Sequence, residues 1–216
     1  IKFQHHLPDE EMLSNIPMSD NFKEPLYDFL VRNSLKLDDH KKIKNECEKI
    51  GINYLCTPFS FKAATEIFQL GVKAFKIGSG EMTDIPSLIR IAKFKLPMII
   101  STGMSTFPEI YETYRTIIKL NKNLILMNCT SEYPPEYEDI NLKVIGVMQK
   151  KFPNALIGHS DHTSDLVTSI GAVALGAVII EKHVTIDKKL EGPDQDVSID
   201  FNDLKVLVNE IKKLYL

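Results

Sequence analysis

Short runs of apolar, often β-branched residues alternate with longer amphipathic stretches along the whole chain. The short runs have the length of buried strands and span residues 1–4, 53–57, 74–77, 97–101, 124–129, 155–158 and 178–183. The amphipathic stretches show helical spacing and span residues 38–50, 61–70, 85–94, 107–120, 142–151, 164–175 and 202–216. This alternation predicts βαβ units and a parallel sheet.

Two α/β architectures fit this alternation. A doubly wound open sheet usually carries a glycine-rich loop after its first strand, but here Gly78-Ser79-Gly80 follows the third run. A TIM (β/α)8 barrel needs eight strands, and seven are visible. We therefore expect an α/β TIM barrel that lacks its first βα unit in this chain, as one domain over residues 1–216. Residues 5–37 are expected to form an irregular loop over the site.

The composition narrows the class of protein. The chain has 216 residues, 44% hydrophobic and 25% charged, with a net charge of −3, which is typical of a globular protein. Neither a nucleic-acid partner nor a membrane partner is expected, because there is no basic surface signal and no apolar run near ~20 residues. Cys47, Cys56 and Cys129 lack ligand-like spacing, which indicates a reducing, cytoplasmic location.

Polar residues follow the predicted strands, where barrel enzymes build their sites. His162 and His183 are 21 residues apart, which is one βα repeat, so both imidazoles should face one mouth. Two neutral imidazoles suit a divalent transition metal and leave positions open for water and substrate oxygen. The alternative is that each is an ordinary hydrogen-bonded histidine. His159 is a weaker candidate ligand. The remaining histidines are expected in loops or on the surface: His5, His6 and His40.

Lys2 and Lys76 end two predicted strands. A lysine at the end of a buried strand is costly unless its ammonium meets an anion. With Thr57, Ser79 and Ser160 nearby, the two lysines form a candidate seat for a phosphate and a carboxylate. Two alternatives stay open: pairing with Glu81 or another acid, and a Schiff base on Lys76.

Two acids follow predicted strands. Glu81 comes directly after Gly80 and could handle protons on a sugar hydroxyl. Asp194 lies in the turn Glu191-Gly192-Pro193-Asp194 and could grip a hydroxylated substrate, although such turns are common without a function.

Eight motifs resemble, in order and over nearly the whole chain, those of the sialic acid (N-acetylneuraminate) synthase family. They are Lys2-Phe3-Gln4, Cys56-Thr57-Pro58-Phe59-Ser60, Phe75-Lys76-Ile77-Gly78-Ser79-Gly80-Glu81, Ser101-Thr102-Gly103-Met104, Cys129-Thr130-Ser131-Glu132-Tyr133-Pro134, Ser160-Asp161-His162-Thr163, Glu181-Lys182-His183 and Gly192-Pro193-Asp194.

The resemblance implies a TIM barrel with Mn²⁺, or else Mg²⁺ or Co²⁺, held by His162 and His183. It implies Lys76 and Glu81 as catalytic residues, with Glu81 close to the reacting carbon. The amino sugar would be contacted by Gln4, Tyr133 and Asp194. The phosphoenolpyruvate pocket would be formed by Lys2, Thr57, Lys76, Ser79, Ser131 and Ser160.

The implied activity is that of a transferase in sialic acid biosynthesis. It joins phosphoenolpyruvate to an N-acetylated amino sugar, N-acetylmannosamine or an analogue, and releases phosphate. Legionaminate or pseudaminate synthesis from a diamino sugar is an alternative, as is a lysine Schiff-base aldolase. A degenerate barrel that only binds sugar phosphates is a third reading. Ser131 stands where several sialate synthases have Asn, so the exact sugar stays open.

Family members begin with a βα unit that carries a catalytic Glu and usually end in a small antifreeze-like domain. We expect both parts to be absent from this chain. In the family that domain covers the partner's active site, so the resemblance implies a homodimer for the full-length protein. It also implies that this stretch alone is inactive or poorly stable.

Overall fold

The computed structural model describes residues 1–15 and 24–214. Within these residues, parallel strands follow one another in chain order in a single sheet. They are β1 (Lys2–His5), β2 (Leu55–Pro58), β3 (Phe75–Ile77), β4 (Met98–Ser101), β5 (Leu124–Cys129), β6 (Leu156–Asp161) and β7 (Ile180–Lys182). Every predicted strand is present, which confirms the parallel α/β sheet.

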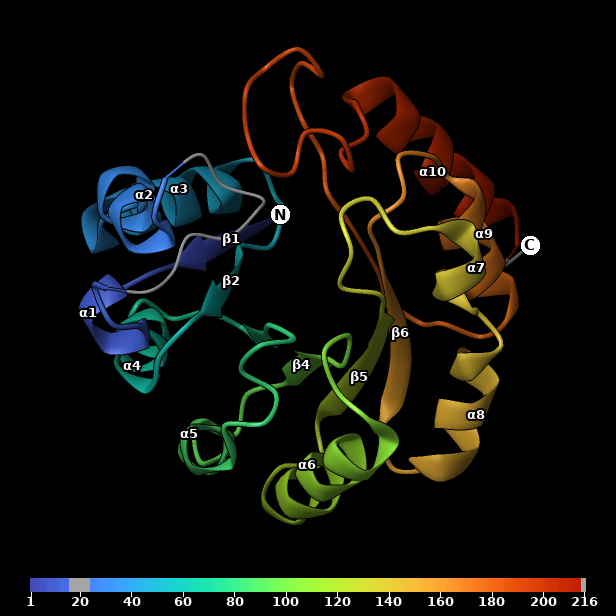
Figure 1. The fold of residues 1–216 in the computed structure, drawn as a ribbon, viewed down its shortest axis with the longest axis horizontal. Helices are drawn as coiled ribbons and strands as arrows, with labels where there is room; N and C mark the ends of the chain where they lie inside the picture. Colours follow the sequence, from blue (N-terminus) through green and yellow to red (C-terminus); the bar gives the residue numbers. More distant parts are fainter. Residues whose placement is uncertain (16–23, 215–216) are drawn as a thin grey trace.

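Helices follow the strands and lie on the outside of a curled sheet (Figure 1). They are α1 (Pro8–Glu11), α2 (Leu26–Asn33), α3 (Leu37–Lys49), α4 (Phe61–Gln69), α5 (Ile85–Ala92), α6 (Phe107–Leu120), α7 (Tyr137–Ile140), α8 (Val144–Lys151), α9 (Val167–Ala174) and α10 (Phe201–Lys213). In the described part of the chain β1 and β7 are the two edges of the sheet and do not pair with each other. The arrangement is barrel-like; the expected missing unit stays a prediction.

Local signals in the sequence determine where several helices begin. The Ser60 hydroxyl accepts a hydrogen bond from the Ala63 N–H at the start of α4. The Asp200 carboxylate accepts from two N–H groups at the start of α10. Thr106 and Glu109 form a capping box at the start of α6. Each cap satisfies backbone donors that the first turn of a helix leaves free.

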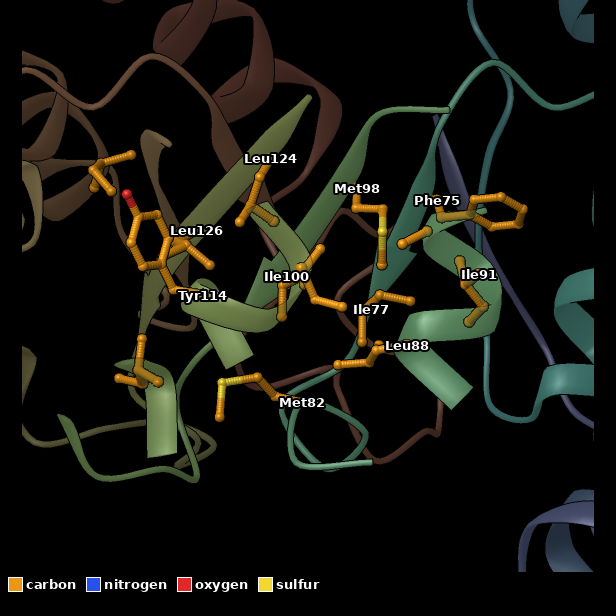
Figure 2. Close-up of a cluster of buried hydrophobic side chains, with 14 of the residues drawn as sticks. Phe75, Ile77, Met82, Leu88, Ile91, Met98, Ile100, Tyr114, Leu124 and Leu126 are labelled. Carbon is orange, nitrogen blue, oxygen red and sulfur yellow. The ribbon is translucent and has the colours of Figure 1, made fainter. Parts of the chain in front are cut away.

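The main apolar core lies between the sheet and the helices. Side chains alternate across each strand, so one set of positions faces outward. Figure 2 shows these outward side chains packed against residues of α5 and α6: Phe75, Ile77, Met98, Ile100, Leu124 and Leu126 meet Leu88, Ile91 and Tyr114. A smaller apolar cluster of Ile99, Ile125 and Met127 lies on the other, inward face. Burying these two clusters provides the hydrophobic free energy that allows polar groups beyond them to be buried.

The expectation for residues 5–37 is partly wrong. Helices α1 and α2 form within this segment, whereas residues 16–23 lie outside the described residues. The clustering of Pro, Asp and Asn suggested a loop, but these residue types also occupy helix starts: Pro8 and Asp9 open α1.

The prediction that His5 and His40 lie in loops or on the surface is also wrong. Their exposed fractions are 1% and 0%. His5 points outward from β1 and its Nε2 lies 2.8 Å from a Glu66 carboxylate oxygen. His40 lies on α3, its Nδ1 2.6 Å from the Tyr54 hydroxyl, and its ring packs edge-on against His5 with centroids 4.8 Å apart. Both are buried because α3 packs over this edge of the sheet.

Within the described residues, no helix combines the length and the apolarity that a membrane crossing requires.

Buried His40 should make stability depend on pH. Burial, together with repulsion from His5, lowers its pKa to about 4, although Asp39 opposes the shift. The unfolded chain binds this proton below about pH 6.5, so the free energy of unfolding should fall as the pH falls from 6.5 towards 4. One such group contributes a slope of up to about 1.4 kcal/mol per pH unit. The free energy of unfolding, measured by urea denaturation across this pH range, should depend less steeply on pH in His40→Asn than in the unsubstituted protein. An unchanged pH dependence would contradict the lowered pKa of His40.

Candidate active site

The inward face of the sheet becomes polar at the carboxyl ends of the strands. Strand register places Gln4 beside Thr57, Ser101 beside Met127, and Ser160 between Cys129 and Glu181. Because neighbouring positions in register on parallel strands face the same side, these residues share one mouth.

Two inward-facing lysines share one carboxylate. The prediction that they end their strands is wrong, because Lys2 is the first residue of β1 and Lys76 the middle residue of β3. Lys2 Nζ lies 2.9 Å and Lys76 Nζ 3.4 Å from Oε1 of Glu181. Ser160 donates a hydrogen bond to the same oxygen at 3.1 Å, and Lys76 also donates to the Ser101 hydroxyl at 2.8 Å. We call Lys2, Lys76, Ser160 and Glu181 the lysine cluster. It joins β1, β3, β6 and β7, and so connects the two edges of the sheet across the mouth.

Lys76 and Ser160 are buried, while Lys2 and Glu181 are partly exposed, and these surroundings influence the protonation of the cluster. Burial lowers the pKa of Lys76, and the Glu181 carboxylate offsets part of the shift. Burial also opposes ionisation of Glu181, but attraction to Lys76 and Lys2 outweighs it and holds the pKa of Glu181 at about 2. At neutral pH the carboxylate is therefore charged. The expected acidic partner of the lysines exists, but it is Glu181 rather than Glu81.

Hydroxyl groups lie around the loops beyond this cluster. The backbone N–H of Gly103 donates to the Ser79 hydroxyl at 3.2 Å, and Cys129 Sγ lies 3.9 Å from the Ser79 hydroxyl and 4.0 Å from that of Ser131. A Cβ at Gly103 would collide with the Ser131 hydroxyl and lie 2.9 Å from the Cys129 carbonyl oxygen. Glycine therefore allows the loops after β4 and β5 to approach each other closely.

The hydroxyl of Thr57 is an unusual case. The side chain is buried, and its Oγ1 has no hydrogen-bond partner among the described residues. A buried hydroxyl without a hydrogen-bond partner costs free energy. A polar ligand that bonds to the Thr57 hydroxyl would offset this cost.

His162 and His183 follow the ends of β6 and β7, two residues beyond Ser160 and Glu181 of the lysine cluster, and their rings lie edge to face. Their ring centroids are 5.3 Å apart. His162 Nδ1 lies 2.8 Å from the Thr130 carbonyl oxygen, which assigns the proton to Nδ1 and leaves a lone pair on Nε2. The Tyr133 hydroxyl lies 3.2 Å from that Nε2, and an oxygen of Asp194 lies 3.4 Å from His183 Nδ1.

The histidine pair has the donor chemistry of a metal site. Burial lowers the pKa of His162 to about 4 and also lowers the pKa of His183, so both rings are neutral near pH 7, the form that binds metals. The carbonyl of Thr130 orients His162 as an outer partner orients a ligand histidine. No group of three or more His, Cys, Asp or Glu side chains arranged for a metal occurs in the described ranges. A divalent ion here would thus take two nitrogens from the protein and further ligands from water or substrate.

Glu81 lies in the loop after β3 with its Oε2 atom buried and, within the described chain, without a hydrogen-bond partner. Gly78 makes room for this oxygen, because a Cβ there would collide with it. Burial raises the pKa of Glu81, and the negative charge of Glu11 adds to the shift. A carboxyl group with a raised pKa keeps its proton to a higher pH than a free carboxyl group, which suits a proton donor or acceptor.

Gln4 contacts a small cluster of polar side chains that His6 and Glu11 form. Its Oε1 is 3.3 Å from His6 Nε2, and His6 Nδ1 lies 2.8 Å from Glu11. The His6 ring stacks on Phe59 with centroids 4.0 Å apart. His6 lies in the loop between β1 and α1, as predicted, and these contacts hold its ring in place.

His159 does not join the pair. Its Nδ1 lies 3.2 Å from the backbone carbonyl oxygen of Asn128, on the outward face of β6. Residues three apart on a strand point to opposite faces, so His159 faces away from His162. The prediction of His159 as a candidate metal ligand is therefore wrong.

Glu181 is the site residue that the sequence reasoning missed. In the sequence Glu181 stands out only as part of the motif Glu181-Lys182-His183. The signal that could have identified it is its position on β7, two residues before His183, because side chains two apart on extended backbone share a face.

Comparison with known proteins identifies the family. The chain matches the NeuB family over residues 1–216. It is 39% identical over 183 residues to an N,N'-diacetyllegionaminic acid synthase of Campylobacter jejuni, covering 83% of this chain and 54% of that protein. It is 36% identical over 175 residues to the human N-acetylneuraminate-9-phosphate synthase, covering 81% and 49%. The chain thus spans about half the length of these curated relatives.

A solved structure agrees with this match. The N-acetylneuraminic acid (sialic acid) synthetase of Leptospira borgpetersenii superimposes with a TM-score of 0.90 at 30% identity, covering 99% of this chain and 72% of that one. The barrel-like sheet, the polar mouth and the match over residues 1–216 lead to one conclusion: the chain belongs to the NeuB family of sialic acid and related synthases.

Proposed function

We propose that this protein condenses phosphoenolpyruvate with an N-acylated amino sugar, N-acetylmannosamine or an analogue, to give a sialic-acid-like nonulosonate and phosphate. The observation that carries the proposal is that one mouth holds two lysines, of which Lys76 is buried, beside two neutral imidazoles with ring centroids 5.3 Å apart. The first suits an anion, and the second suits a divalent ion beside it.

The lysine cluster would bind phosphoenolpyruvate. Lys2 and Lys76 carry two positive charges against the single negative charge of Glu181, so the cluster keeps a local positive charge although the chain has a net charge of −3. The substrate's phosphate and carboxylate would complete the neutralisation in a buried, low-dielectric place. Hydrogen bonds would come from the surrounding hydroxyls, with the unpartnered Thr57 among them: Thr57, Ser79, Ser131 and Ser160.

His162 and His183 would hold the divalent ion, with Mn²⁺ as the first expectation and Mg²⁺ or Co²⁺ as alternatives. When bound, the ion would act as a Lewis acid on the sugar carbonyl. The chain prepares this role by keeping both rings neutral and by orienting His162 through Thr130.

The sugar would lie between the histidine pair and Glu81. Tyr133 and Asp194 flank the histidines, and Gln4 reaches the mouth from β1, so these three side chains are placed to contact sugar hydroxyls and the N-acyl group. The electron pair of the C2=C3 double bond of phosphoenolpyruvate would form the bond from C3 to the aldehyde carbon, which leaves a cation at C2, and the aldehyde oxygen would take a proton to become a hydroxyl. Glu81, with its raised pKa, would exchange that proton. Water would then add at C2 and lose one proton, which replaces the one given to the aldehyde oxygen. As C2 becomes a ketone, the C2–O bond to phosphate would break and the phosphate would leave with the second proton.

The sugar itself has more than one candidate. Relatives of similar identity include synthases named for legionaminic acid and for N-acetylneuraminate 9-phosphate. The lysine cluster and the histidine pair serve the chemistry that these products would share. A diamino sugar, giving legionaminate or pseudaminate, is therefore the second candidate substrate. The homodimer and the cytoplasmic location expected from the resemblance stay predictions.

The first test supplies Mn²⁺, phosphoenolpyruvate and N-acetylmannosamine to the full-length protein and measures phosphate release and the nonulosonate product. A parallel assay uses a 2,4-diacetamido sugar. We expect turnover with one of the two sugars. Phosphate release with neither would overturn the substrate assignment.

A second test addresses the aldolase alternative, which the lowered pKa of Lys76 favours. Lys76 is engaged by Ser101 and Glu181, so we expect no imine with pyruvate. Borohydride treatment in the presence of pyruvate should leave the intact mass unchanged. A reduced pyruvate adduct mapped to Lys76 by peptide mass spectrometry would support the aldolase instead.

A third test removes one imidazole. His183→Ala should abolish metal-dependent turnover and weaken Mn²⁺ binding by at least about tenfold, because one of two nitrogen donors is lost. The fold should persist, since His183 lies at a strand end outside the apolar core; circular dichroism checks this. Unchanged activity would remove His183 from the site.

A further inference from the structure

The two residues that precede the histidines form a buried ion pair. Asp161 comes before His162 at the end of β6, and Lys182 comes before His183 at the end of β7. The strand register places Asp161 directly beside Lys182. Because successive side chains point to opposite faces, both point towards the helices while the two imidazoles point into the mouth.

This pair is enclosed and fully bonded. Lys182 Nζ lies 3.0 Å from Oδ2 of Asp161, and the two side chains are 3% and 1% exposed. Oδ1 of Asp161 accepts hydrogen bonds from the Thr163 N–H at 2.9 Å and hydroxyl at 2.8 Å. Oδ2 accepts from the hydroxyls of Thr168 at 2.6 Å and Ser169 at 2.5 Å, both on α9. We call Asp161, Lys182 and Thr163 the clamp.

Lys182 completes the clamp on the other side. Its ammonium donates to the Thr163 carbonyl oxygen at 2.6 Å and to the Thr163 hydroxyl at 3.1 Å. Lys182 therefore contacts the residues on both sides of His162: the side-chain carboxylate of Asp161 before it and the backbone carbonyl of Thr163 after it. His183 is the next residue after Lys182, so this ammonium connects the segments that carry both rings.

Backbone bonds hold the main chain of this region but not its side chains. Strand β7 has three residues and, among the named strands of the described chain, pairs with β6 alone. Just beyond it, the His183 carbonyl oxygen accepts from the Ile199 N–H at 3.0 Å, and the Thr185 N–H donates to the Ile199 carbonyl oxygen at 2.9 Å. Buried ion pairs add little net stability compared with apolar residues of similar size, so the clamp is better explained by the geometry that it imposes.

We propose that the clamp is a positioning device, which sets the separation and the orientation of His162 and His183 so that both imidazoles are ready for one divalent ion. The inference rests on the proposed function for the identity of the ligand. The geometric part does not depend on the ion, because it concerns the rings of the metal-free protein.

The test compares variants of the full-length protein. Lys182→Met leaves the Asp161 charge buried without its partner and could prevent folding, so the decisive variant is the double substitution Asp161→Asn with Lys182→Met, which removes both charges together. Lys182→Arg keeps the charge and should restore binding. Lys188→Met is the matched control: Lys188 pairs with Asp203 at 2.9 Å, but this pair is exposed, at 49% and 38%.

Two readouts are taken from each protein. Crystal structures of the metal-free proteins give the ring positions, which should move by more than about 0.5 Å or split into two rotamers in the double variant. Mn²⁺ titration followed by electron paramagnetic resonance gives the dissociation constant. We expect it to rise at least about tenfold in the double variant, and to stay unchanged in Lys188→Met.

The outcomes separate the two proposals. Unmoved rings in a folded double variant overturn the clamp, whatever the metal does. Moved rings with an unchanged Mn²⁺ dissociation constant also overturn it, because the positioning would then be without effect. A wild-type protein that binds no Mn²⁺ overturns the metal part of the proposed function, while the ring positions still decide the geometric claim.

Discussion

The alternation of side chains along short parallel strands is the constraint on which this structure depends. Outward positions such as Ile77 and Leu126 are apolar and pack under the helices. Inward positions include both apolar residues, such as Ile125, and charged residues, such as Glu181. Because adjacent residues necessarily face opposite ways, a strand of three or four residues can stabilise the domain and supply the mouth at the same time.

Because side chains alternate, consecutive residues at the ends of β6 and β7 have two different roles. Asp161 and Lys182 bond outward to each other, while His162 and His183 face inward with ring centroids 5.3 Å apart. The outward pair costs desolvation and is tolerated because every oxygen and the ammonium have partners. A polar network that is fully satisfied has few alternative arrangements, which makes it a suitable support for side chains that must keep a set geometry.

The electrostatics of the mouth follow from burial rather than from the overall charge. Glu181 lies between Lys2 and Lys76, so the two ammonium groups do not face each other without a counter-charge. At the ends of β6 and β7, burial keeps His162 neutral, and in the loop after β3 burial raises the pKa of Glu81. The same burial thus acts in different ways on groups with different partners.

The sequence by itself determined the order of strands and helices, the parallel sheet and the strand ends at which polar groups gather. These are local properties, set by the period of apolar residues and by the turns and caps between them. It also placed Lys2, Lys76, His162 and His183 at the mouth. Only the tertiary structure decided which groups meet. Glu181 reaches Lys2 because the sheet curls until its first and last strands approach, and no sequence period encodes that distance. His5 and His40 are buried because α3 closes over the edge of the sheet, and a histidine has the same appearance in a sequence whether a helix covers it or not.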